Sequence, residues 1–277
     1  MYSKIFKCSY VYIKCIFVCH NKLKIRKLKD MNIKQYLDST YLKTAEQAGL
    51  SENENAQIVE AFVKEAIEEN FKLIMIRPNM ISLAKKMIVE ANSMVLVGTV
   101  IDFPEGTSSI DDKLKEAQQA IDEGADDLDF VCNYAAFKRG EISVVKEEIL
   151  KCTQIGLNKN KVVKWIIEVA ALTDMEIIQL SSLIKNVIIS NFEQELFSAV
   201  FVKSSTGFYE TENNLPNGAT MPAIKMMLDN ASPLPVKAAG GVKTYNEAVA
   251  MIQLGVKRIG TSGAKNIANG QNLQNEY

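Results

Sequence analysis

From residue 31 onward the chain alternates short apolar runs with longer segments of helical periodicity, and this alternation limits its possible folds more than any other feature. Strands that alternate with helices form a parallel sheet. Eight strands that alternate with helices over about 250 residues predict an α/β fold, a single-domain (β/α)8 TIM barrel. The predicted strands are 36–40, 71–76, 95–101, 127–132, 162–169, 199–203, 235–239 and 257–261. The predicted helices are 51–69, 79–92, 111–123, 143–156, 174–189, 220–230 and 244–254. A doubly wound open sheet is the competing architecture, but no GxGxxG motif follows a strand, so a dinucleotide site has no support.

Three segments are expected along the chain. Residues 1–30 form an N-terminal extension outside the fold, residues 31–270 form the barrel, and residues 271–277 form a flexible polar tail that ends in Tyr277. The apolar stretch of the extension is interrupted by Lys14 and is too short to span a membrane. Met31 opens a stretch that reads like a natural start, so we interpret residues 1–30 as an appendage.

Composition excludes several classes of function. Residues 1–30 are strongly basic and the rest of the chain is net acidic, so the barrel is a poor non-specific binder of nucleic acid or anionic membranes. The only histidine, His20, lies in the extension. Histidine-based catalysis and histidine metal sites are therefore excluded from the barrel. No cofactor is expected. The cysteine positions form no disulfide framework, which favours a cytoplasmic location.

Two lysines occupy comparable places on consecutive predicted strands. Lys203 ends the run AVFVK, and Lys237 lies in the run PVKAA. Neighbouring parallel strands lie ~4.8 Å apart, so a matching register would crowd two ammonium groups. At about 5–6 Å and an effective dielectric near 20 they repel by ~3 kcal/mol, which with some desolvation brings one lysine toward neutrality. A neutral lysine amine attacks carbonyls to form a Schiff base. We assign the nucleophile to Lys203 and expect Lys237 to pair with a carboxylate such as Asp129; two unrelated lysines on the rim are the alternative.

Two glycine-rich turns have the form of phosphate-binding loops. Gly240 and Gly241 lie between a predicted strand and a helix, and the turn from Gly260 through Thr261 and Ser262 repeats this arrangement after the last strand. Glycines let the backbone approach an anion, and the loops after strands seven and eight are the common phosphate position in these barrels. Ordinary turn glycines are the alternative interpretation. Other polar positions are Asp38, at the end of the first run, and Gly207, after the hydroxyl run that ends in Thr206.

The fifth strand carries a further charged pair. Lys164 and Glu168 lie on one face of this strand, so an internal ion pair between them is expected. Trp165 points the other way and is expected to pack against helices.

Residues 31–270 resemble the deoxyribose-phosphate aldolase family. The matching segments are YLDSTYLKT, GTVIDFPEG, DEGADDLDFVCNYAAFKRG, VKWIIE, FVKSSTGF, VKAAGGVKT and RIGTSGAK. The resemblance implies a metal-independent barrel enzyme that reversibly cleaves 2-deoxy-D-ribose 5-phosphate to D-glyceraldehyde 3-phosphate and acetaldehyde.

The resemblance also implies roles for individual residues. It makes Lys203 the Schiff-base lysine, Lys237 the second lysine and Asp129 its carboxylate partner. We expect the substrate-binding set to be Asp38, Thr206, Gly207, Gly240, Gly241, Gly260, Thr261 and Ser262. The expected partners are a small sugar phosphate and, as a homodimer, a second copy of the chain.

The chain departs from the family pattern at two positions. Ser39 stands where a histidine is common, and Met75 stands where a cysteine is common. The second change removes a thiol near the site and predicts better tolerance of reactive aldehydes. Two alternatives remain open: a Schiff-base aldolase for another phosphorylated sugar, and a sugar-phosphate-binding barrel without catalysis.

Overall fold

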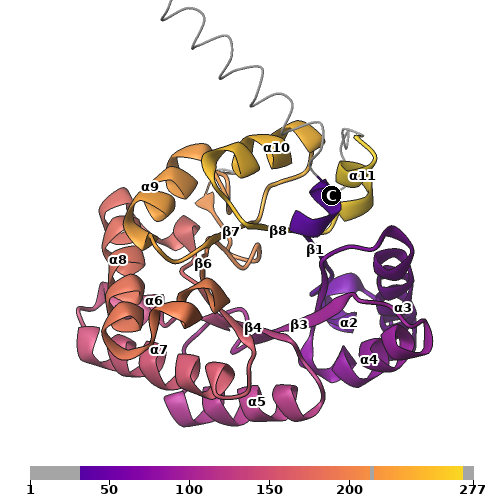
Figure 1. Cartoon of the computed structure of the whole chain (residues 1–277), viewed down its shortest axis with the longest axis horizontal. Coiled ribbons are helices and arrows are strands. Elements are labelled where there is room, and N and C mark those ends of the chain that lie inside the picture. The colour runs from indigo at the N-terminus through magenta and orange to yellow at the C-terminus, as the bar shows by residue number, and fades with distance from the viewer. Residues whose placement is uncertain (1–31, 213–214, 271–277) are drawn as a thin grey trace, which may run out of the picture. The chain divides into compact units, whose positions relative to one another are not determined.

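A computed structural model describes residues 32–212 and 215–270 of the chain. Within this part, eight parallel strands close into a barrel in which each strand pairs with the next and β8 pairs with β1 (Figure 1). The predicted (β/α)8 TIM barrel is therefore confirmed. The strands are β1 (Leu37–Thr40), β2 (Leu73–Ile76), β3 (Leu96–Ile101), β4 (Asp127–Val131), β5 (Val162–Ile166), β6 (Val200–Lys203), β7 (Val236–Ala239) and β8 (Arg258–Thr261).

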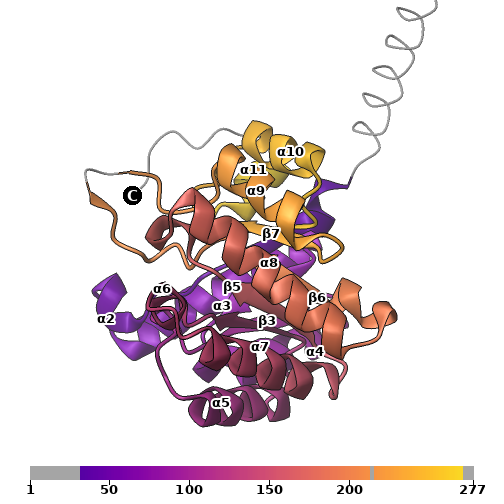
Figure 2. The same cartoon turned by 90° about the vertical axis from the view of Figure 1, so that its left-hand side faces the viewer.

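Helices surround the strands on the outside of the barrel, as Figures 1 and 2 show. The long helices are α3 (Glu52–Glu69), α4 (Ile81–Glu90), α5 (Ile110–Asp122), α7 (Ile142–Leu157), α8 (Asp174–Asn191), α9 (Met221–Ala231) and α10 (Tyr245–Leu254). Short helices are α2 (Ala45–Ala48), α6 (Tyr134–Lys138) and α11 (Ala264–Ala268), with 3-10 turns η1 (Ile33–Tyr36), η2 (Pro78–Met80), η3 (Val169–Ala171) and η4 (Gln194–Ala199). The short elements were not predicted, because a single turn carries too few residues to show a period. None of the described helices has the length and apolar composition needed to cross a membrane.

Local sequence explains where the long helices begin. Helix α3 starts with a capping box in which the Ser51 hydroxyl accepts from the N–H of Glu54 and the Glu54 carboxylate accepts from the N–H of Ser51. Thr173 begins α8 and Thr244 begins α10 in the same way, each with a glutamate three residues later. Such caps satisfy backbone donors that have no partner within the helix.

The two faces of β5 serve different parts of the barrel. Trp165 is fully buried on the helix side, where it stacks on Phe130 with ring centroids 5.3 Å apart and donates a 3.0 Å hydrogen bond to Thr153 of α7. Its predicted packing against helices is confirmed.

Strand β5 ends at Ile166, three residues before the predicted end. The chain turns at Glu168, whose φ of 54° is left-handed and does not continue a strand.

The chain divides into the units Met1–Ile33 and Lys34–Tyr277, and the barrel belongs to the second. The predicted extension at residues 1–30 and the predicted tail at residues 271–277, with Tyr277, lie outside the described residues. The boundary placed at residue 31 therefore stays a prediction.

Candidate active site

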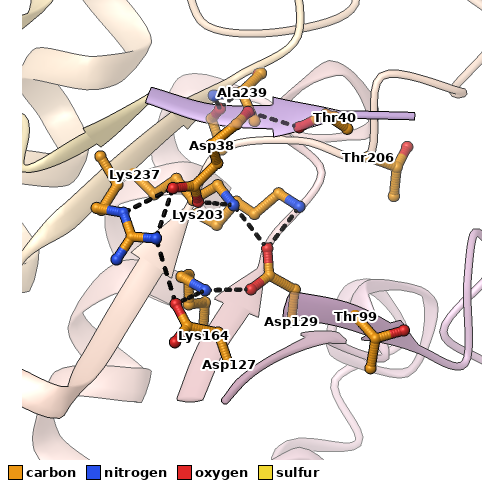
Figure 3. A network of polar contacts seen from close by, with 12 residues as sticks. Asp38, Thr40, Thr99, Asp127, Asp129, Lys164, Lys203, Thr206, Lys237 and Ala239 are labelled. Atoms are coloured by element: carbon orange, nitrogen blue, oxygen red, sulfur yellow. Dashed lines mark hydrogen bonds and ion pairs between the residues drawn. The ribbon is translucent and has the colours of Figure 1, made fainter. Parts of the chain in front are cut away.

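Lys203 and Lys237 are direct partners across neighbouring strands of the barrel. The register of β6 and β7 aligns Lys203 with Lys237. Both ammonium nitrogens lie 2.9 Å from the same oxygen, Oδ2 of Asp129 on β4 (Figure 3). The two nitrogens are therefore no more than about 5.8 Å apart, which is the crowding expected from the sequence.

Asp129 is the centre of this cluster. It is fully buried, its Oδ2 accepts from both lysines, and its Oδ1 accepts a 2.6 Å hydrogen bond from Lys164. Burial by itself raises the pKa of Asp129, but the charges of these three lysines outweigh burial and hold the pKa well below its ordinary value. Asp129 is thus a buried carboxylate that stays ionised and bridges three cations.

The expected ion pair between Lys164 and Glu168 is wrong, because Lys164 has other partners. Its nitrogen contacts Oδ1 of Asp129 and lies 2.8 Å from Oδ2 of Asp127. Burial lowers the pKa of Lys164, but Asp127 and Asp129 together raise it above its usual value. The reason for the error is the left-handed backbone at Glu168, which takes that side chain off the strand pattern.

Asp38 lies deeper than its expected place at the end of the first strand. It is the second residue of β1, it is fully buried, and its two oxygens contact different cations. Oδ2 is 2.6 Å from the Lys237 nitrogen and Oδ1 is 2.5 Å from Nη2 of Arg258. This placement favours support of Lys237 over the direct substrate contact expected from the sequence.

Arg258 of β8 is a member of the cluster that sequence reasoning missed. Besides Asp38, its Nη2 lies 3.4 Å from Oδ2 of Asp127. Arg258 and Gly260 lie two residues apart on the same strand, so they are on the same face of that strand. This alternation could have identified Arg258 from the sequence. In the part of the chain that the structure describes, no group of metal-ligating side chains is arranged to hold an ion.

Lys203 is a weaker base than an ordinary lysine. Burial is the main cause that lowers its pKa to about 8, the charge of Lys237 lowers it further, and Asp129 opposes both. We had expected repulsion between the lysines to be the main cause, with desolvation as an aid; the order is the reverse. The side chain retains 3% exposure, whereas Lys164 and Lys237 have none.

The expected phosphate turns meet at one edge of the barrel. Gly207, Gly240 and Gly241 have φ values of 82°, 79° and 80°, which only glycine adopts readily. A Cβ built on Gly207 would lie 4.0 Å from Cα of Gly240, so the turns after β6 and β7 are adjacent. A Cβ on Gly240 would meet the Gly218 backbone at 2.9 Å, which explains why this turn is built from glycines.

Hydroxyl groups hold the other turns in shape. Thr261 donates a 2.9 Å hydrogen bond to the carbonyl of Val242 and accepts from the N–H of Gly263. Gly260 of β8 is aligned with Asp38 of β1. Ser262 follows as an exposed residue of the turn before α11.

Glu168 is a second functional candidate that the sequence did not reveal. Its Oε2 accepts from both the N–H and the hydroxyl of Thr206, while the Thr206 oxygen accepts from the N–H of Phe208. Burial raises the pKa of Glu168 against these hydrogen bonds. The residue therefore ties the end of β5 to the turn that follows Lys203.

Comparison with known proteins gives a consistent picture. Residues 40–270 match the family model described as DeoC/LacD family aldolase. Deoxyribose-phosphate aldolase of Thermococcus gammatolerans is 35% identical over 87% of this chain and 96% of its own. The enzyme of the same name from Lactiplantibacillus plantarum is 34% identical over 84% of this chain and 97% of its own.

Solved structures agree with the sequence relatives. A structure described as a putative deoxyribose-phosphate aldolase from Coccidioides immitis has a TM-score of 0.69 and 29% identity over 86% of both chains. The aldolase QR15 has a TM-score of 0.72 and 29% identity over 86% of this chain and 95% of its own. On this evidence, the chain belongs to the DeoC/LacD family of aldolases.

Proposed function

We propose that the chain is a deoxyribose-phosphate aldolase that reversibly cleaves 2-deoxy-D-ribose 5-phosphate to D-glyceraldehyde 3-phosphate and acetaldehyde. The observation that carries the proposal is the position of Lys203, a weakly basic lysine that shares one carboxylate oxygen with Lys237. At pH 7 an amine with a pKa of about 8 is neutral in about a tenth of the molecules, and this neutral fraction attacks aldehydes.

In the proposed mechanism, the neutral Lys203 amine attacks C1 of the open-chain sugar phosphate. The carbinolamine loses water to give an iminium, which accepts the electron pair of the breaking C2–C3 bond as the C3 hydroxyl loses its proton. Glyceraldehyde phosphate leaves, and the resulting enamine takes a proton at C2. Hydrolysis of the new iminium then releases acetaldehyde and restores the amine.

Asp129 and Lys237 are the proposed proton carriers for these steps. Both lie beside the Lys203 nitrogen, and positioned side chains that move protons accelerate such steps typically 10²- to 10⁴-fold. In this proposal the Asp38 carboxylate binds and orients the Lys237 ammonium. This positioning role replaces the substrate-binding role that we expected for Asp38 from the sequence.

The substrate phosphate is assigned to the turns after β6, β7 and β8. Gly207, Gly240 and Gly241 have left-handed backbones, and Gly207 lies next to Gly240. In this proposal their backbone N–H groups bind the phosphate. Thr206, Thr261 and the Gly260 and Ser262 positions shape these turns. The expected sugar-phosphate partner has its reacting end at Lys203 and its anionic end here.

Two further expectations belong to this proposal. We propose a cytoplasmic location, which suits the buried and unpaired Cys132 and Cys152. We also propose a homodimer, to be checked by light scattering; among the relatives, the structure from Aeropyrum pernix is described as tetrameric.

Borohydride trapping tests the proposed function directly. With acetaldehyde, reduction should leave an ethyl group on Lys203, detected by peptide mass. Lys203→Ala should abolish trapping, whereas Lys225→Ala on the exposed surface of α9 should leave it intact. Trapping at wild-type level in Lys203→Ala would overturn the assignment.

Product analysis separates the alternative functions. Cleavage of deoxyribose phosphate to the two named aldehydes supports the proposal. Trapping without this cleavage indicates a Schiff-base aldolase for another phosphorylated sugar. Phosphate-ester binding without trapping indicates a barrel without catalysis.

A further inference from the structure

The cluster around Asp129 has an uneven balance of charges. Its carboxylates are Asp38, Asp127 and Asp129, and three of its cations are Lys164, Lys203 and Lys237 (Figure 3). The fourth cation is Arg258. With every group ionised the cluster carries one excess positive charge. It becomes neutral when one lysine loses its proton, and Lys203 is the lysine that retains some exposure.

Lys164 and Asp127 lie next to the proposed reaction centre without a role in the steps described above. Lys164 occupies Oδ1 of Asp129 at 2.6 Å, while Lys203 and Lys237 share Oδ2. Asp127 holds the other side of the Lys164 ammonium at 2.8 Å, and both residues are fully or almost fully buried. Charges in such an interior are poorly screened, so each one acts on its neighbours.

We propose that Lys164 and Asp127 are positioning residues that set the charge state of the reacting amine. Lys164 occupies one oxygen of the Asp129 carboxylate and supplies a nearby positive charge, so that a larger fraction of Lys203 is present as the free amine. Asp127 limits this effect by partly neutralising Lys164. The inference rests on the proposed function for its catalytic meaning, but the charge relation holds in the protein without substrate.

Four charged side chains act on Lys203 from the elements packed around it. Asp129 faces it from β4, Lys164 from β5, Glu168 from the turn after β5 and Lys237 from β7. Removal of Lys164 leaves these groups in place and deletes one positive charge. Removal of the Asp127 charge leaves them in place and deletes one negative charge. The two changes must therefore move the titration of Lys203 in opposite directions.

The experiment is a pH titration of Lys203 by NMR of protein labelled with ¹³C at the lysine ε-carbon, without substrate. The Lys203 resonance is the one that disappears in Lys203→Ala. In Lys164→Met its midpoint should rise by about one pH unit, and in Asp127→Asn it should fall by a similar amount. The double variant Asp127→Asn/Lys164→Met should return it close to the wild-type value.

Controls separate this charge effect from general damage. Lys151→Met, which removes an exposed lysine of α7, should leave the midpoint unchanged. Loss of packing does not produce opposite shifts that cancel in the double variant. If Lys164→Met does not fold, Asp127→Asn carries the test by its sign, since an unchanged or raised midpoint overturns the proposal.

The pH dependence of turnover supplies the catalytic readout. The acidic limb of the pH–rate profile should follow the NMR midpoint in each variant, because the rate falls as Lys203 becomes protonated. A folded Lys164→Met with an unshifted Lys203 midpoint refutes the charge-setting role even if the protein is an active aldolase. Conversely, shifted midpoints in a protein that cleaves no sugar phosphate would retain the charge relation and refute the proposed function.

Discussion

Replacement of Lys237 by methionine tests how much of the weak basicity of Lys203 comes from its neighbour. Methionine keeps the length of the buried side chain and removes its charge. The two nitrogens are at most about 5.8 Å apart. At about 5 Å and an effective dielectric near 20 their repulsion is ~3 kcal/mol, or ~2 pKa units.

Burial remains in the variant, and burial is the larger cause of the lowered pKa of Lys203. We therefore expect the pKa to rise from about 8 by roughly one to two units and not to reach the value of a free lysine. The sign is fixed by the chemistry: protonation removes the nucleophile, so reactivity is lost as the pH falls below the pKa. At pH 7 about a tenth of Lys203 is neutral in the wild type, and this fraction should fall about 10- to 100-fold in Lys237→Met.

The assay is the rate at which a 1,3-diketone forms an absorbing enaminone with Lys203, measured from pH 6 to pH 10.5. The wild-type rate should rise about tenfold per pH unit and level off above pH about 8. The Lys237→Met curve should be displaced to higher pH and reach a similar plateau. Lys225→Met is the matched control. A midpoint that stays near 8 in a folded Lys237→Met would show that burial alone weakens the base.

Three further predictions concern other parts of the barrel. Asp129→Asn should still form the Schiff base but turn over about 10²- to 10⁴-fold more slowly, because the proposed proton carrier is lost. Borohydride trapping measures Schiff-base formation and a steady-state assay measures turnover. Unimpaired turnover would contradict the proposed role of Asp129. Thr153→Val should lower the free energy of unfolding by about 1–3 kcal/mol, because the indole N–H of Trp165 stays buried and loses the Thr153 hydroxyl that accepts its hydrogen bond. Thr153→Ser is the control in urea denaturation, and equal stability of both variants would remove the argument. Treatment of the folded protein with iodoacetamide should leave activity intact, because burial raises the pKa of the Cys132 thiol well above its usual value and that of Cys152 to about 12. Loss of activity with label on either cysteine would refute this prediction.

The order of elements and the two central lysines could be predicted from the sequence because their signals are local. Apolar runs and helical periods are properties of neighbouring residues, and eight repeats leave few architectures. Lys203 and Lys237 stood out because charged residues rarely interrupt buried strands. The sequence predicted their adjacency only on the condition that the two strands share a register, and the structure shows that they do.

The partners of the cluster were decided by tertiary structure. Asp38, Asp127 and Arg258 come from β1, β4 and β8, and no local pattern states that residues so far apart in the sequence meet inside the barrel. The left-handed turn at Glu168 redirected that side chain from Lys164 to Thr206. The cause of the weak basicity of Lys203 was hidden for the same reason, because desolvation depends on what the whole fold places around a group.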